Sequence, residues 1–153
     1  MDIEKKIKEL NLEIPHAPDP VGAYVAFKKI NNLLFISGQL PISSKNEMIK
    51  GKVDSNLTIQ DGQKAATLCA LNLIAQVKKA CQNDLNKVNG CIKITGYVNS
   101  SENFTDQPKV INPASEIISS IFSDGGKHTR AAVGVSSLPL GAAVEIDGIF
   151  DLK

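Results

Sequence analysis

Residues 129–150 read TRAAVGVSSLPLGAAVEIDGIF. Two runs in and just beyond this stretch, Arg130 to Ser137 and Val144 to Leu152, have the alternation and β-branched content of half-buried strands. The residues between them, 138–141, read LPLG, and proline and glycine favour tight turns. The chain is therefore expected to end in two strands joined by a short turn.

Apolar periodicity predicts a further set of strands and helices before this pair. In chain order they are a short helix capped by Asp2, strands at Tyr24–Ile30, Leu33–Gln39 and around Met48–Val53, a long helix from Thr58 to about Cys81, a strand at Val88–Asn99, and a second long helix from about Asp106 to Phe122. Pro113 interrupts the last helix, so either Asn112 caps a helix that starts at Pro113 or the helix is kinked there. This order predicts an α+β fold with two main helices on one face of a sheet.

The length of 153 residues suits a single domain over 1–153, with residues 1–12 as an N-terminal helical extension. Two helices can cover only one face of the sheet. Leu33 and Phe35 are nevertheless apolar on the face of their strand opposite Leu34 and Ile36. The second face is therefore expected to need burial as well, and another copy of the chain is the simplest cover.

Charge and composition argue against several classes of protein. A formal net charge of +1 provides no broad field for phosphate backbones, so nucleic acid is not expected as a partner. The N-terminus MDIEKKIKEL lacks the apolar core of a signal peptide, and no apolar run could span a bilayer, so a soluble, cytoplasmic protein without a membrane partner is expected. Cys69, Cys81 and Cys91 are odd in number and widely spaced, which favours buried free thiols over disulfides or a metal site.

Arg130 is the residue that points most directly to chemistry. Strand alternation places Arg130 with Ala132 and Gly134 on one face and Val133 with Val135 on the other. On this pattern, Arg130 and Glu145 both point away from the helix-covered core. A guanidinium matches a carboxylate with two parallel hydrogen bonds, so this surface suits a small organic acid. A structural salt bridge between Arg130 and Glu145 explains the same spacing equally well.

Three sequence runs resemble the RidA/YjgF family, which is also labelled endoribonuclease L-PSP. They are GAYV at 22–25, LLFISGQLPI at 33–42 and the stretch at 129–150 quoted above, in the family order and with similar spacing from about Val21 onward. The N-terminal helix and the run NSSENFTDQPKVINPAS at 99–115 are similar to a longer subgroup. The resemblance implies a chorismate-mutase-like α+β fold, a homotrimer, and active sites in clefts between subunits.

The resemblance also implies roles for individual residues. Arg130 matches the arginine that pairs with the substrate carboxylate, and Glu145 matches the acidic residue near the attacking water. The positions that match substrate-pocket residues are Tyr24, Ser37, Gly38, Asn112 and Ala132. At Ala132 the best-studied branch of the family has a cysteine, so this chain departs from the pattern there. His16 and His128 have no metal-ligand partner at a suitable spacing, and both are interpreted as surface residues, with a place at the mouth of the cleft as the alternative for His128.

The activity implied is hydrolysis of a 2-imino acid, or of its enamine tautomer, to a 2-oxo acid and ammonia. No metal or organic cofactor is needed, because an imine carbon is already electrophilic and catalysis can come from holding the acid beside a water molecule. A regulatory protein that binds a small carboxylate without turnover would use the same arginine. The ribonuclease suggested by the older family label ranks last, since the sequence shows no basic groove or aromatic stacking platform.

Overall fold

A computed structural model describes residues 2–153 and places them in one mixed sheet covered by helices. The helices are α1 (Ile3–Glu9), α2 (Ile59–Ala80) and α3 (Gln107–Phe122), with short 3₁₀ turns η1 (Leu85–Lys87), η2 (Ser123–Gly126) and η3 (Pro139–Gly141). The strands are β1 (Phe27–Ile30), β2 (Leu33–Gln39), β3 (Val88–Asn99), β4 (Thr129–Val135) and β5 (Val144–Leu152). No helix within residues 2–153 is both long enough and apolar enough to cross a membrane.

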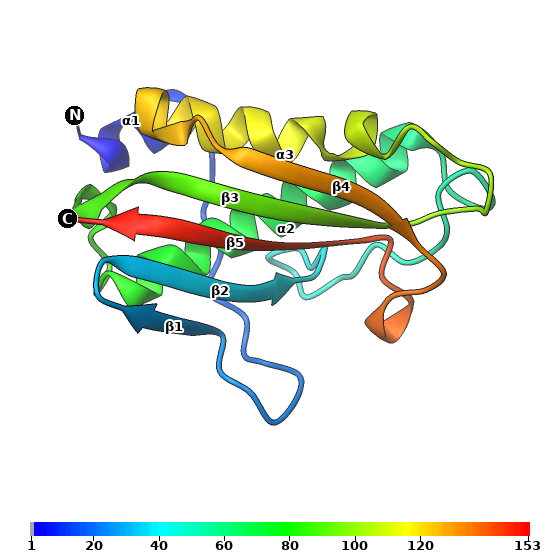
Figure 1. Cartoon of the computed structure of the whole chain (residues 1–153), viewed down its shortest axis with the longest axis horizontal. Helices are drawn as coiled ribbons and strands as arrows, with labels where there is room; N and C mark the ends of the chain where they lie inside the picture. Colours follow the sequence, from blue (N-terminus) through cyan, green and yellow to red (C-terminus); the bar gives the residue numbers. More distant parts are fainter. Residues whose placement is uncertain (1) are drawn as a thin grey trace.

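The sheet has the strand order β1-β2-β5-β3-β4 and is parallel only between β3 and β4. A parallel pair needs a crossover connection, and α3 provides it. Figure 1 looks onto the uncovered face of the sheet, with α2 and α3 lying behind it. The expected α+β sheet with two main helices on one face and a short N-terminal helix is therefore confirmed.

Local sequence explains where the helices begin. Thr58 and Asp61 form a reciprocal capping box at the start of α2, and the Asp2 carboxylate accepts a hydrogen bond from the Lys5 amide at the start of α1. The face that α2 turns to the sheet is small and fully buried, with Ala65, Ala66, Cys69, Ala70 and Leu73 along it. Small side chains on this face allow α2 to pack closely on the sheet.

Pro113 lies inside a continuous α3, so no separate helix starts at Pro113. A proline in a helix leaves the carbonyl four residues earlier without its usual donor. Here that carbonyl belongs to Lys109, and the Gln63 side chain of α2 donates to it over 3.0 Å. The loss of one helical hydrogen bond is thus offset by a bond between the two main helices.

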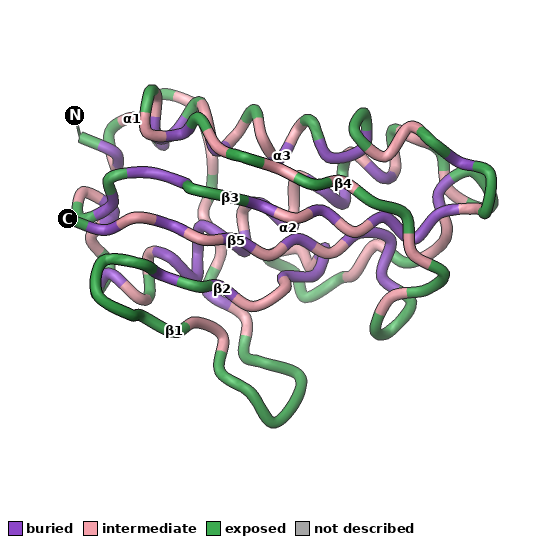
Figure 2. Tube along the Cα trace, viewed as in Figure 1, coloured by how far each residue is buried: buried purple, intermediate pink, exposed green. Residues whose placement is uncertain are grey.

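Two predicted strands differ from the structure. The segment Met48–Val53 makes only isolated bridges, because Gly51 and Asp54 have φ angles of +133° and +64° and interrupt the extended backbone. The first strand begins at Phe27 instead of Tyr24, because its ladder with β2 ends at the pair Phe27 and Ile36. The residues just before β1 form an exposed loop, which is green in Figure 2.

All three cysteines are buried free thiols, as expected. Burial raises the pKa of the Cys69 thiol far above its ordinary value and that of Cys91 to about 12. On the uncovered face of the sheet, by contrast, Leu33, Phe35 and Val133 keep between 37% and 43% of their surface exposed. The structure therefore leaves an apolar surface uncovered in the single chain.

A close approach between Gly96 of β3 and Ile111 of α3 gives the first testable prediction. A Cβ atom added at Gly96 would lie 2.6 Å from the Ile111 side chain, which is fully buried. We expect Gly96→Ala to lower the free energy of unfolding in urea by about 1–3 kcal/mol through overpacking. In the double variant with Ile111→Val, which removes one of the nearest atoms, the loss should be smaller than the sum of the two single losses. Additive losses would contradict this contact.

Candidate active site

The residues predicted to form the site fall into two groups on opposite faces of the sheet. Arg130 stands opposite Ile94 in the parallel ladder, and Ile94 is fully buried against the helices, so Arg130 lies on the helix side. Glu145 stands opposite Tyr97 in the ladder between β3 and β5 and lies on the uncovered side. Because they lie on opposite faces of the sheet, with β3 between their strands, these two side chains cannot meet within one chain.

This arrangement corrects two expectations. Arg130 does not share a face with Glu145, and no salt bridge joins them among the described residues. Two valines in β4 suggest a core-facing side, but Val133 is 43% exposed on the uncovered side. β4 is an edge strand, and Arg130 on its helix-covered face stays only half-buried beside α3.

The first group surrounds the guanidinium of Arg130. Its Nη1 donates to the Asn112 side-chain oxygen at 2.9 Å and to the Ser115 hydroxyl at 3.2 Å, both on α3. Ala132, two residues further along β4, is half-buried and packs against the core. Within residues 2–153 no hydrogen bond engages Nη2 or Nε of Arg130. The guanidinium is thus held at Nη1, and the donor atoms Nη2 and Nε are left for a ligand.

His128 extends this group and is not a surface residue without partners. Its ring is half-buried, with Nε2 3.0 Å from the Ser115 hydroxyl and Nδ1 2.6 Å from the Gly126 carbonyl oxygen. Metal-ligand spacing gives no indication of this role, because the partners of the ring are a hydroxyl and a backbone carbonyl. A two-residue separation from Arg130, which places both side chains on one strand face, was the available signal.

The second group is built around a β-bulge in β2. Ser37 and Gly38 of β2 stand opposite the single residue Asp147 of β5, since the ladder shifts by one between Ile36 and Gln39. The Glu145 carboxylate lies directly against the Gly38 backbone, in space that any Cβ at position 38 would occupy. At the bulge, position 38 therefore requires glycine, and the backbone there sets the position of the Glu145 carboxylate.

The same bulge holds the loop that carries Tyr24. The Ser37 hydroxyl donates to the Val25 carbonyl at 2.7 Å, and the Ser37 amide donates to the Ala26 carbonyl at 2.9 Å. Tyr24 itself is 47% exposed beside this backbone. Ser37, Gly38 and Glu145 are thus brought together at the bulge, with the loop of Tyr24 beside them, away from Arg130, Asn112 and Ala132.

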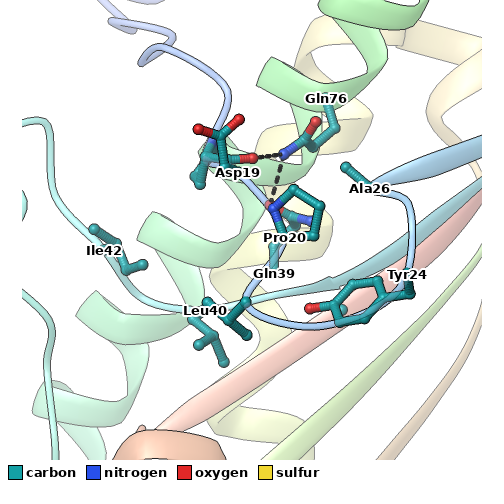
Figure 3. Close-up of a pocket in the computed structure, with 11 residues that line it drawn as sticks. Asp19, Pro20, Tyr24, Ala26, Gln39, Leu40, Ile42 and Gln76 are labelled. Carbon is teal, nitrogen blue, oxygen red and sulfur yellow. Dashed lines mark hydrogen bonds between the residues drawn. The ribbon is translucent and has the colours of Figure 1, made fainter.

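A pocket lies between this loop and the end of β2, with Tyr24 and Gly38 among its lining residues (Figure 3). Gln76 of α2 donates through its side-chain amide to the Pro18 carbonyl at 2.6 Å and toward Gln39 Oε1 at 3.4 Å. Gln39 in turn donates to the Ser37 carbonyl at 2.9 Å. These side-chain amides connect α2 to the bulge, and both glutamines line the pocket.

Glu145 is electrostatically distinct from an ordinary surface carboxylate. Burial, and after it the negative charge of Asp147, raises the pKa of Glu145 above its usual value. The Tyr97 hydroxyl donates to Asp147 at 3.1 Å, and burial together with this carboxylate raises the pKa of Tyr97. Tyr97 therefore stays protonated at neutral pH and keeps Asp147 in place beside Glu145.

This electrostatic coupling predicts that Asp147→Asn lowers the pKa of Glu145, because it removes the neighbouring negative charge. The measurement is a titration of the Glu145 side-chain carboxyl carbon by NMR. Asp151→Asn is the matched control, since Asp151 follows on the same strand face but lies further away. An equal shift in both variants, or none in Asp147→Asn, would show that Asp147 does not act on Glu145.

Comparisons with known proteins extend over nearly the whole chain. The family model described as "YjgF/chorismate mutase-like, putative endoribonuclease" matches residues 4–149. The chain is 42% identical to the Agrobacterium tumefaciens protein Atu1372, of unknown function, with a TM-score of 0.88 and coverage of 99% of this chain and 94% of that one. A Shewanella oneidensis MR-1 structure, described as a "putative endoribonuclease", is 25% identical with a TM-score of 0.94, covering 99% of this chain and 100% of that one.

A relative with a named activity is also similar to this chain. The 2-iminobutanoate/2-iminopropanoate deaminase of Dermatophagoides farinae is 30% identical, over 90% of this chain and 92% of that protein. These findings confirm the resemblance drawn from the sequence runs at 22–25, 33–42 and 129–150. Because the family model spans both groups of candidate site residues, the chain belongs to the YjgF/chorismate mutase-like family.

Proposed function

We propose that this protein hydrolyses 2-imino acids, or their enamine tautomers, to 2-oxo acids and ammonia. The observation that carries the proposal is the guanidinium of Arg130, held at Nη1 by α3 and left with two donors. Two parallel donors suit a carboxylate, which every 2-imino acid carries. Similarity to the deaminase of Dermatophagoides farinae supports the choice of reaction.

Glu145 is the group proposed to act on water. A carboxylate with a raised pKa is a better proton acceptor than a fully solvated one, and Glu145 has this property. As the water oxygen bonds to the imine carbon, Glu145 accepts a proton from the water and the C=N electron pair moves to nitrogen. Glu145 passes that proton to the nitrogen, which gives a carbinolamine. It then transfers the hydroxyl proton in the same way, so that the nitrogen leaves as ammonia when the C–N bond breaks and the C=O bond forms.

The remaining site residues are proposed to shape the cleft. Tyr24 and Ser37 form the wall on the loop side, and backbone groups near Gly38 or Ala132 hold the imine nitrogen. Asn112 holds the guanidinium from α3. Binding the acid and aligning water supply the rate enhancement by proximity, so the proposed reaction involves no metal or organic cofactor.

We propose that several copies of the chain build each site, and the homotrimer is the assembly that the family resemblance implies. Arg130 and Glu145 lie on opposite faces of one sheet, so one ligand can touch both only if neighbouring subunits each contribute one of them. The exposed side chains Leu33, Phe35 and Val133 offer an apolar surface for such contacts. We place the active sites in clefts between subunits on these grounds and on the family resemblance.

Removal of the Arg130 guanidinium tests the carboxylate anchor. We expect Arg130→Ala to lose nearly all acceleration of ammonia release from 2-iminopropanoate generated by an amino-acid oxidase. Arg130→Lys should recover little, because an ammonium cannot form the paired bonds. Lys127→Ala, which removes an exposed nearby cation paired with Asp124, should behave as wild type. Unchanged turnover in Arg130→Ala would remove this residue from the site.

Mixed subunits test whether the site is shared. Arg130→Ala and Glu145→Gln are each expected to be inactive alone. When the two variants are unfolded and refolded together, about a quarter of the clefts should combine an intact Arg130 with an intact Glu145, and activity should return to about that level. If activity does not return although mixed oligomers form, Arg130 and Glu145 of neighbouring subunits do not act on the same ligand, and the shared site is contradicted.

A binding protein without turnover is the second candidate, because the free donors of Arg130 suit binding and catalysis equally. Release of 2-oxo acid, followed with lactate dehydrogenase, separates the two. Binding of 2-oxobutanoate without any turnover of imine would favour the regulatory protein. RNA cleavage that is lost with Arg130→Ala would instead favour the ribonuclease named in the family description.

A further inference from the structure

The hydrogen bonds around Arg130 continue beyond the residues that the family resemblance marks. Ser115 lies between Arg130 and His128, 3.2 Å from Nη1 of the first and 3.0 Å from Nε2 of the second. The opposite side of the imidazole lies 2.6 Å from the Gly126 carbonyl oxygen. A line of polar contacts therefore runs from the guanidinium to the backbone at the end of η2.

The direction of each bond in this line follows from its chemistry. A carbonyl oxygen can only accept, so Nδ1 of His128 carries the proton that points to Gly126. In the neutral ring Nε2 is then an acceptor, and the Ser115 hydroxyl donates its single proton to it. A lone pair of the Ser115 oxygen is left to accept from Arg130.

The backbone at the far end of this line is tightly packed. Gly126 is buried, and a Cβ added there would lie 2.6 Å from both the Ile118 carbonyl oxygen and the Ser119 Cα. The Ser119 hydroxyl also donates to the Gly126 carbonyl, at 3.3 Å. The acceptor that selects the histidine tautomer is thus fixed by the end of α3.

We propose that Ser115 and His128 are positioning residues, which hold the Arg130 guanidinium so that its Nη2 and Nε donors face the carboxylate of the ligand. This inference rests on the proposed function only in taking a small carboxylate as the ligand. Asn112 and Ser115 together fix Nη1 from two directions, and the tautomer of His128 fixes the hydroxyl of Ser115. Preorganisation of this kind strengthens binding by reducing the freedom lost when the ligand arrives.

Substitutions at Ser115 and His128 test this line of polar contacts, by calorimetric binding of 2-oxobutanoate and by steady-state kinetics. Ser115→Ala is expected to weaken binding about tenfold and to raise KM while kcat changes little, because a hydrogen bond to a charged group is lost. Ser115→Thr keeps the hydroxyl and should restore affinity. Ser119→Ala is the control, since that hydroxyl touches Gly126 but not Arg130. Wild-type affinity in Ser115→Ala would overturn the proposal.

Substitutions of His128 separate its two nitrogens. His128→Gln retains an acceptor oxygen at the position of Nε2 and should bind 2-oxobutanoate almost as wild type. His128→Asn places its amide near the position of Nδ1, keeps the bond to Gly126 and loses the one to Ser115, so it should weaken binding about as much as Ser115→Ala. Equal affinities in the two variants would contradict a role for Nε2.

Nitrogen-15 NMR of the imidazole rings gives a readout that does not depend on activity. The chain has two histidines, so His16→Gln leaves a single ring signal, that of His128. At mildly alkaline pH we expect the Nδ1–H tautomer of His128, and the Nε2–H tautomer would overturn the proposed line of hydrogen bonds.

Wild-type protein that binds 2-oxobutanoate but does not turn over imine contradicts the deaminase alone. Wild-type protein that does not bind 2-oxobutanoate overturns both proposals.

Discussion

The parallel pairing of β3 with β4 requires the chain to cross one face of the sheet, and α3 is that crossing. The glycines on the helix-covered face of these strands make the approach close. At Gly96 the Ile111 side chain occupies the space of a Cβ, and at Gly134 the side chains of Gln107 and Ser100 do so. This close packing places the polar side of α3 along the edge strand, within reach of Arg130. The geometry of the guanidinium is therefore a consequence of the crossover.

A second constraint acts on the other face of the sheet. The bulge at Ser37 and Gly38 inserts one extra residue into β2, so the backbone turns its unpaired groups toward the Tyr24 loop and the space above Gly38 is left to the Glu145 carboxylate. A side chain at position 38 would displace that carboxylate. The packing that confines Glu145 also raises its pKa, with Asp147 adding to the effect. The irregular pairing of β2 and the raised pKa of Glu145 thus both trace to the bulge at Ser37 and Gly38.

Most of the secondary structure could be predicted from sequence because local signals and packing agree. The limits of β2, β3 and β5 are those expected, and the capping box at Thr58 marks the start of α2. The segment at Met48–Val53 could not be assigned correctly, since its β-like composition says nothing of the positive φ angles that interrupt it. The bulge was also hidden, because it depends on the register with β5.

The motif resemblance proposes the candidate site residues, but it does not give their placement relative to one another. Alternation along β4 separates Arg130 from Val133, yet it does not state which face the helices cover, and the valines suggested the wrong one. The contacts of Ser115 with His128 and Arg130 could not be predicted from sequence, because they depend on how α3 lies against β4. Contacts between elements distant in the chain carry information that periodicity lacks.

The three cysteines have a practical consequence for anyone who handles the protein. The Cys69 thiol points to the Val144 carbonyl inside the core, and at neutral pH almost none of it, or of Cys91, is ionised. Only the thiolate reacts readily with alkylating reagents and peroxides. Labelling of Cys69 therefore requires α2 and the sheet to separate, so the labelling rate measures how often the native state opens there.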